Sequence, residues 1–198
     1  PGTLHVEHRK AAAANAAPAD NVDYTIVNPR HLERELADAV CQQCHLRGAA
    51  TVLARGRKIA DFRPGLPLQD FRQDYWLDTG DASMTVVGHV EQMHLSRCYK
   101  ESDSLTCMTC HNPHAFPAPE RQVEYYRAKC LRCHQAQACT VEITHRAKIS
   151  PQNNCVQCHM PSADTEVPHV SFTHHRIGIH QSGGAGVKQP ARPSAAID

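Results

Sequence analysis

The sequence predicts a mainly α-helical chain with much irregular structure and little β. Its short helices are expected to wrap around a bulky apolar group that is not made of amino-acid side chains. Aromatic residues make up only 5% of the 198 residues, which is thin for a protein core, while Pro and Gly number 13 and 10. Cysteine and histidine are enriched together, at 10 and 15 residues. Joint enrichment of these two residue types indicates a metal or a covalently attached cofactor rather than disulfides alone.

The first half of the chain is predicted to hold an arm, a helix and a hairpin. Residues 1–28 form an N-terminal arm, which is rich in alanine and is either a linker or a loosely held helix. A helix is predicted from Pro29 to Cys41, because Leu32, Leu36 and Val40 recur at helical spacing. Residues 51–54 and 58–62 flank a short turn and are predicted to pair as a hairpin.

The second half is predicted to hold two further helices and a tail. Val86, Val90 and Met93 share one helical face, and a helix opening at Pro119 runs to Cys130. Residues 181–198 have no pattern and are predicted to be a loose C-terminal tail. The domain proper is therefore placed at residues 29–180, and residues 46–106 within it are the expected place for family-specific contacts.

Four copies of the pattern C-x-x-C-H use eight of the ten cysteines, far more copies than composition predicts. This pattern is the attachment signature of c-type haem. Two thiols one helical turn apart form thioethers with the porphyrin, and the adjacent histidine is the proximal iron ligand. The predicted attachment residues are Cys41, Cys44, Cys107, Cys110, Cys130, Cys133, Cys155 and Cys158, and the proximal ligands are His45, His111, His134 and His159.

Four covalently attached haems are thus predicted, and their faces supply the apolar volume that aromatic side chains lack. The competing interpretation is zinc, because the cysteine pairs at 107/110 and 130/133 have the spacing of a zinc ribbon. Zinc does not require a histidine after every pair, so haem is favoured. A thioredoxin-like redox pair is less favoured still, because four copies lack the expected βαβ context.

Eleven histidines remain after the proximal ligands, which is enough to give every iron a second histidine. Bis-histidine haems of low potential are therefore predicted over His/Met ligation. The distal candidates are His94, His114, His169 and His175, with His145 in reserve and His89, His174 and His180 as further candidates. His5 and His8 lie far upstream of the first motif, where they either ligate a haem of another chain or missing segment, or are solvated; His5 is kept as a reserve ligand.

The two cysteines outside the motifs are Cys98 and Cys139. Haem attachment requires export, and exported compartments oxidise thiols. A disulfide between them is expected, and the alternative is two separate thiols. Because the chain begins with Pro1, we expect a processed or trimmed product that once carried an export signal.

Several stretches in combination resemble the multihaem cytochrome domain of exported bacterial proteins, which often accompanies tetratricopeptide repeats and is distantly similar to the tetrahaem cytochromes of nitrifiers. Besides the C-x-x-C-H motifs, the stretches are Asp61-Phe62-Arg63-Pro64-Gly65-Leu66-Pro67-Leu68, Ser96-Arg97-Cys98-Tyr99, His111-Asn112-Pro113-His114, Cys158-His159-Met160-Pro161 and Thr173-His174-His175-Arg176-Ile177. The resemblance covers roughly residues 1–180. It implies electron transfer through closely packed haems, and it supports His114 and His175 as ligands and Cys98 with Cys139 as a pair.

The start of the chain departs from this family. Its members usually carry a further C-x-x-C-H-G-P-G upstream with a histidine shortly after it, whereas this chain opens at Pro1-Gly2-Thr3-Leu4-His5 and has no tetratricopeptide repeat. Either a haem-bearing segment precedes this point, or His5 serves a haem across a subunit contact.

The predicted function is electron transfer without catalysis, because an iron with two histidine ligands has no open position for substrate. The expected partners are redox proteins or an extracellular electron acceptor, and a homo-oligomer or extracellular filament is the expected assembly. The alternative is a multihaem oxidoreductase acting on a small nitrogen or sulfur compound at one five-coordinate haem. A third interpretation is a module whose haems are structural.

Charge and hydropathy exclude other partners. Lys plus Arg number 21 and Asp plus Glu number 20, a net charge of +1, so a nucleic-acid partner is not expected. No apolar stretch approaches the roughly 20 residues that span a bilayer. The predicted location is extracellular or periplasmic.

Overall fold

The structure is a computed structural model that describes residues 2–14, 23–46, 48–76, 88–135, 138–164 and 169–180. Its described part is mainly helical with much irregular structure and little sheet, as the sequence predicts. Contacts divide the chain into two compact units: Pro1–Trp76 with Ser104–Met108, and Leu77–Asp103 with Thr109–Asp198. The region 29–180, predicted as one domain, contributes to both units, and the predicted tail at 181–198 lies outside the described residues.

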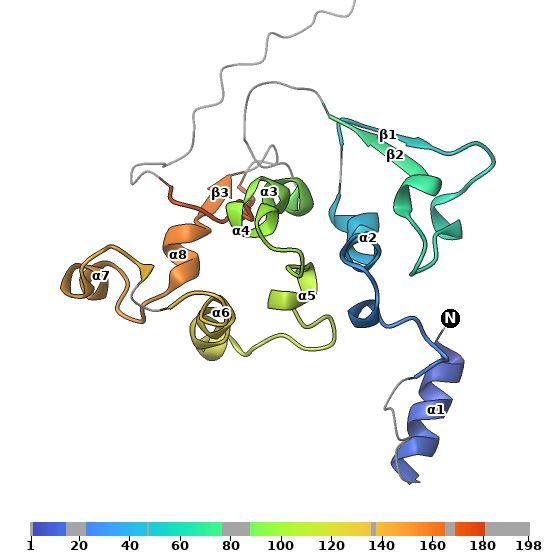
Figure 1. Cartoon of the computed structure of the whole chain (residues 1–198), viewed down its shortest axis with the longest axis horizontal. Coiled ribbons are helices and arrows are strands. Elements are labelled where there is room, and N and C mark those ends of the chain that lie inside the picture. Colours follow the sequence, from blue (N-terminus) through green and yellow to red (C-terminus); the bar gives the residue numbers. More distant parts are fainter. Residues whose placement is uncertain are drawn as a thin grey trace, which may run out of the picture. The chain divides into compact units, whose positions relative to one another are not determined.

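The first unit contains helix α1 (Thr3–Ala14), helix α2 (Arg34–His45), and strands β1 (Ala50–Leu53) and β2 (Arg72–Tyr75) (Figure 1). Three single-turn 3-10 helices lie between these elements, at Pro29–His31, Ile59–Asp61 and Leu68–Asp70.

The helix predicted from Pro29 begins later than expected. Asn28 Oδ1 accepts a hydrogen bond from Arg30 N and caps a 3-10 turn, after which Leu32 is extended. This capping turn takes the chain out of the helical path, so α2 starts at Arg34. The most buried part of α2 is residues 37–39. The leucines at 32 and 36 are only half-buried.

The predicted hairpin is wrong in its second strand. Strand β1 pairs antiparallel with β2, with Ala50 opposite Tyr75 and Leu53 opposite Arg72. Residues 59–61 form a 3-10 turn instead, because the Asp61 carboxylate accepts a hydrogen bond from Lys58 N and closes it. The true partner strand is too polar to show the alternation of a half-buried strand.

The first unit has a small apolar cluster of Ala39, Phe62, Leu68 and Phe71, with Leu46 packed against it. The two phenylalanine rings meet edge to face, with centroids 5.7 Å apart. This cluster joins α2 to the 3-10 turns and to the start of β2. It therefore fixes where the last turn of α2, which carries the first C-x-x-C-H motif, lies within the unit.

Replacing Phe71 by alanine is expected to lower the free energy of unfolding by about 3–5 kcal/mol, because a buried aromatic ring is lost and a cavity is left. The matched control is Phe116→Ala, since Phe116 is 85% exposed. The control is expected to change stability by no more than about 0.5 kcal/mol. Denaturant unfolding of the haem-loaded chain measures both, and equal effects of the two substitutions would contradict the assigned core.

The second unit contains helices α3 (His89–Leu95), α4 (Arg97–Lys100), α6 (Gln122–Cys130), α7 (Ile143–Ile149) and α8 (Cys155–His159). Strands β3 (Ser162–Asp164) and β4 (Ser171–Thr173) pair antiparallel. Helix α5 (Cys107–Cys110) lies where the chain passes from one unit to the other.

Two helices of the second unit confirm predictions made from the sequence. Val90 and Met93 are buried on α3, as their helical spacing predicts, whereas Val86 lies outside the described residues. The helix predicted from Pro119 opens as a 3-10 turn, Pro119–Arg121, and continues as α6 to Cys130. Helices α6 and α8 contact each other (Figure 1).

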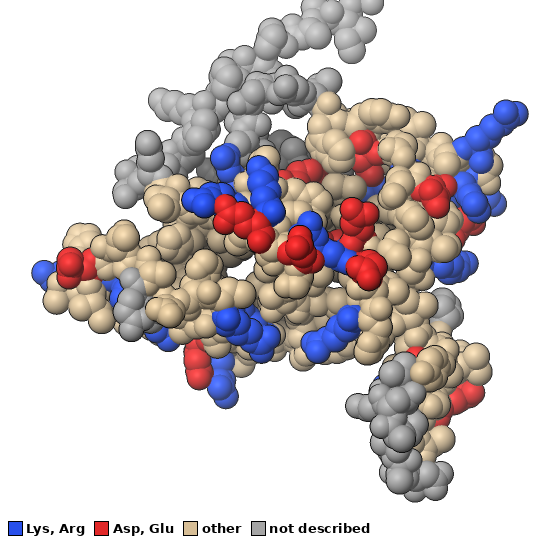
Figure 2. Space-filling model, viewed as in Figure 1, with Lys and Arg blue, Asp and Glu red and all other residues tan. Residues whose placement is uncertain are grey.

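On the face drawn in Figure 2, neither sign of charge dominates. Acidic and basic side chains both occur on the face drawn in Figure 2, with wide uncharged areas between them. Among the helices that the structure describes, none is both long and apolar enough to cross a membrane.

Candidate haem-binding motifs

All four C-x-x-C-H motifs lie on or at the end of a short helix. The first is the last turn of α2, and the second is α5 with the residue that follows it. The third begins at the end of α6, where His134 N donates to Cys130 O at 3.0 Å, and the fourth is α8. In each motif the two cysteines are therefore one turn apart, which is the spacing that attachment to one porphyrin edge requires.

Three motifs share a pattern of exposure. Their first cysteine is half-buried and their second is exposed, at Cys44, Cys133 and Cys158. In the first and third motifs the histidine is exposed as well. In these motifs an attachment thiol points outward and a histidine lies beside it. A thiol and an imidazole placed in this way fit a haem that lies against the surface of the helix.

The exposure of apolar side chains also fits a bulky apolar cofactor. Among the described residues only seven hydrophobic side chains are buried: four form the cluster around Phe71, two lie on α3, and the seventh is Ala37. Seventeen large hydrophobic side chains of the described part are exposed, Trp76 and Ile179 among them. The polypeptide thus leaves much apolar surface that porphyrin faces could cover.

The first cysteines of the first and second motifs come together in the first unit, although 66 residues separate them. The Cys107 thiol donates a hydrogen bond to Cys41, which lowers the pKa of Cys41 to about 7 and raises the pKa of Cys107. The long sequence separation of these two motifs could not show this contact.

Asp38 joins the same two motifs. Its residue is 1% exposed, and its Oδ1 accepts a hydrogen bond from Cys107 N at 3.1 Å, while Oδ2 has no hydrogen-bond partner. Asp38 is one helical turn before Cys41. One buried carboxylate therefore lies beside the first attachment cysteine of the first motif, Cys41, and beside that of the second motif, Cys107. Sequence reasoning missed this residue, and its helical spacing from Cys41 was the available signal.

The third and fourth motifs come together in the second unit through the contact of α6 with α8. The Cys130 and Cys155 thiols are hydrogen-bonded, and the pKa of Cys130 rises to about 11, chiefly because burial disfavours the thiolate. The first cysteines are thus in contact between the first and second motifs and between the third and fourth, and Cys110 of the second motif also raises the pKa of Cys130.

His175 is the predicted distal ligand that lies nearest to a proximal one. Its ring centroid is 6.1 Å from that of His111, and the two ring planes differ by 25°. The ring of His89, a further candidate from the sequence, has its centroid 4.6 Å from that of His175. Burial, followed by the charge of His89, lowers the pKa of His175 to about 4, so this ring is neutral at pH 7.

Backbone contacts set the tautomer of His175. Its Nδ1 is 2.8 Å from Thr173 O, and because a carbonyl only accepts, Nδ1 carries the proton and Nε2 keeps its lone pair. The neighbouring His174 differs, because its Nδ1 accepts from Arg176 N at 3.1 Å. The fourth motif's His159 resembles His175, with Nδ1 donating to Gly178 O at 2.8 Å.

Ser96 holds the segment that carries His175. This serine is 1% exposed. Its Oγ accepts a hydrogen bond from Ile177 N at 2.8 Å and donates one to His175 O at 3.2 Å. Ser96 follows α3 directly, so His175 is anchored to that helix from both sides. Nothing in the sequence pattern indicated this anchor.

The other predicted distal ligands are dispersed. His94 on α3 stacks on Tyr99 with centroids 4.3 Å apart. His114 and His169 are exposed, and His169 has a positive φ of 63°. The reserve candidate His145 is exposed on α7. For His114, His169 and His145, the structure describes no ring contact with a motif histidine that would resemble the pairing at His111.

His5 and His8 share a buried partner. His5 Nδ1 is 2.7 Å and His8 Nδ1 is 3.2 Å from Asp23 Oδ2, and Arg9 Nε is 3.3 Å from the same atom. The Asp23 carboxylate also accepts hydrogen bonds from Thr25, which lower its pKa well below the usual range. These contacts hold α1 against residues 23–25.

Cys98 and Cys139 are both free in the structure, so the predicted disulfide is not formed there. The thiols have different surroundings. Burial raises the pKa of Cys98, with a smaller contribution from Cys133, whereas a hydrogen bond from the Val141 backbone lowers the pKa of Cys139. Their pairing stays a prediction.

The zinc interpretation has no preformed site in the described residues, since no three His, Cys, Asp or Glu side chains are grouped there as around a metal ion.

Comparison with known families gives a match to part of the chain. The family of the doubled CXXCH motif matches residues 100–139, which include the second and third motifs. Searches of curated proteins and of solved structures found no match. The family match supports a multihaem c-type cytochrome domain, and it indicates covalently bound haem c and a role in electron transfer.

Proposed function

We propose that the chain conducts electrons through four covalently attached c-type haems, most of them with two histidine ligands. The carrying observation is that all four C-x-x-C-H motifs lie on a helical turn, with the matched family covering two of them. When bound, each haem would supply an iron that changes its oxidation state by one electron. The cysteines hold the porphyrin, and the histidine beside each pair holds the iron.

The pair His111 and His175 supports bis-histidine ligation of the second haem. An imidazole nitrogen lies about 2 Å from a bound metal. Two rings that share one ion therefore have centroids about 6 Å apart, and the observed distance is 6.1 Å. The backbone contact at Thr173 leaves Nε2 of His175 able to ligate, which is the common arrangement of a ligating histidine.

We also propose pairwise electron exchange within the first and second haems and within the third and fourth. The contact of Cys41 with Cys107, and that of Cys130 with Cys155, support this arrangement. An attachment thiol is bonded directly to its porphyrin, so touching thiols bring the edges of two macrocycles near each other. Export, a redox partner or extracellular acceptor, and assembly into a filament belong to the same proposal.

The test is the haem content and spin state of the purified chain. Intact mass and the pyridine haemochrome assay are expected to give four haems per chain, and electron paramagnetic resonance is expected to show low-spin ferric iron. A high-spin signal that responds to cyanide or nitrite would favour the oxidoreductase instead. A chain without haem would overturn the proposal, and a small monodisperse particle would overturn the filament.

A further inference from the structure

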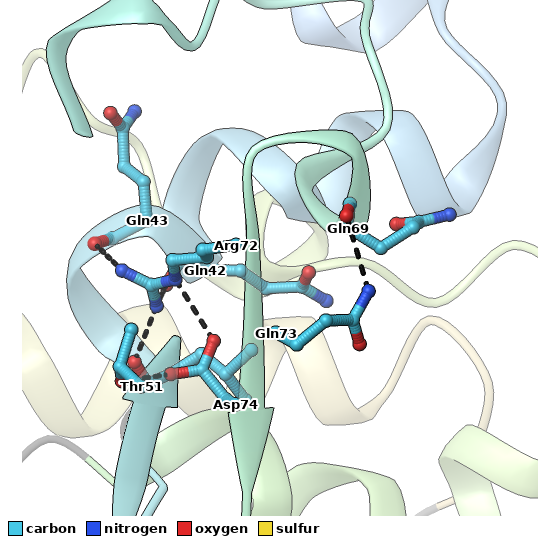
Figure 3. A network of polar contacts seen from close by, with 8 residues as sticks. Gln42, Gln43, Thr51, Gln69, Arg72, Gln73 and Asp74 are labelled. Atoms are coloured by element: carbon cyan, nitrogen blue, oxygen red, sulfur yellow. Dashed lines mark hydrogen bonds and ion pairs between the residues drawn. The ribbon is translucent and has the colours of Figure 1, made fainter. Parts of the chain in front are cut away.

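Arg72 on β2 reaches the last turn of α2, where the first C-x-x-C-H motif lies (Figure 3). Its Nη1 donates to Gln43 O at 2.9 Å, and its Nη2 donates to Gln42 O at 3.1 Å and to Leu46 O at 2.8 Å. Its Nε donates to Asp74 Oδ2 at 2.9 Å. One guanidinium thus serves three backbone carbonyls and one carboxylate.

The three carbonyls belong to the motif and its immediate end. Gln42 and Gln43 are the two residues between Cys41 and Cys44, and Leu46 directly follows His45. The last carbonyls of a helix lack partners within the helix, and a cation is favoured beside them. Arg72 therefore holds the backbone on both sides of the segment that carries the second attachment thiol and the proximal histidine.

Both charges of this contact are buried. Arg72 is 9% exposed, and the Asp74 side chain is 3% exposed. Thr51 Oγ1 donates to Asp74 Oδ1 at 2.6 Å, so the carboxylate is held from the neighbouring strand as well. Buried charges are costly unless they are paired and hydrogen-bonded. This pair is both, and its position against the motif suggests a use beyond joining β2 to α2.

We propose that Arg72 is a positioning residue for the first haem, and that the Arg72–Asp74 pair adjusts the reduction potential of that haem. This inference rests on the proposed function. The fork of the guanidinium limits the movement of Cys44 and His45, which a lysine at this position cannot do in the same way. The pair places two opposite buried charges beside one motif, so removing either changes the local field in a known direction.

The signs of the two effects are opposite. A positive charge near a haem stabilises the added electron, so loss of Arg72 lowers the reduction potential. A negative charge does the reverse, so loss of Asp74 raises the potential. Damage to the fold would not produce opposite shifts, and the signs therefore separate an electrostatic role from a purely structural one.

The experiment compares Arg72→Gln and Asp74→Asn in reductive titrations of the haem-loaded chain, followed by absorption and electron paramagnetic resonance. The first haem is identified by its loss in a Cys41→Ser/Cys44→Ser chain. Arg72→Gln is expected to lower its equilibrium constant for reduction about tenfold, which corresponds to about 59 mV for one electron. Asp74→Asn is expected to raise it. The other three haems are expected to titrate as in the parent.

Two further variants guard against misfolding. Arg72→Gln/Asp74→Asn removes both charges and is expected to titrate close to the parent. Arg72→Lys keeps the charge but loses the fork, so it is expected to shift the potential less while broadening the low-spin signal of the first haem. The matched control is Arg63→Gln, because Arg63 Nη1 donates to two carbonyls of the same unit, Ala60 O at 2.6 Å and Phe62 O at 2.7 Å, and to none of the motif.

Shifts in the same direction for Arg72→Gln and Asp74→Asn, or no shift at all, would overturn the inference. Loss of the first haem alone in Arg72→Gln would support the positioning role. A parent chain that carries no haem would instead overturn the proposed function. The two failures are distinguishable because the haem content of the parent is measured first.

Discussion

Replacing His175 by alanine is expected to turn one of four low-spin haems into a high-spin haem with an open position. In the proposed bis-histidine arrangement, His175 is the distal ligand of the second haem, because its ring lies 6.1 Å from that of His111. Electron paramagnetic resonance and absorption spectra of the oxidised chain measure the change. Added imidazole is expected to restore the low-spin signal. His175→Met is expected to keep a six-coordinate iron and to raise its potential, because thioether ligation does so.

The matched control for this substitution is His174→Ala, one residue away. Nδ1 of His174 already accepts from Arg176 N, so this ring is not presented as His175 is, and four low-spin haems are expected to remain. His89 lies close enough to His175 to replace it as a ligand, so the double variant His89→Ala/His175→Ala is measured as well. If the double variant also keeps four low-spin haems, His175 is not a distal ligand.

The attachment motifs were predictable from the sequence, whereas their arrangement was not. Two cysteines and a histidine within five residues define a local chemistry, and one helical turn suffices to present it. The contact between Cys41 and Cys107 depends on how α2 packs, and no local pattern encodes it. His175 and His174 differ in the backbone group that each Nδ1 meets. Adjacent residues of the same type cannot be told apart by spacing alone.

The fold shows the same division. Helices α3 and α6 were predictable because their apolar residues recur at helical spacing, or because proline marks their start. Strand β2 was not, because it is short and polar, and its place depends on the burial of Arg72 against α2 and on pairing with β1. A charged residue becomes buried only where its partners are supplied by distant parts of the chain.

Replacing Cys155 and Cys158 by serine is expected to reduce the haem content from four to three per chain. The third haem is expected to change more than the others, because the Cys130 thiol contacts Cys155 and the macrocycle attached at Cys130 loses its neighbour. Intact mass gives the haem count, and the potentials and low-spin signals of the remaining haems show which one responds. The loss is expected to be local, because Asn154 and Gly178 hold α8 by hydrogen bonds that need no cysteine.

The reciprocal variant is Cys41→Ser/Cys44→Ser, which also removes one haem but at the other pair. Here the second haem is expected to respond most, because Cys41 contacts Cys107. Two deletions of equal chemistry thus have different nearest neighbours, so general destabilisation cannot produce both patterns. Equal perturbation of all remaining haems in both variants would refute the pairwise arrangement while leaving haem attachment intact. A count that stays at four in either variant would refute attachment at the motif that was removed.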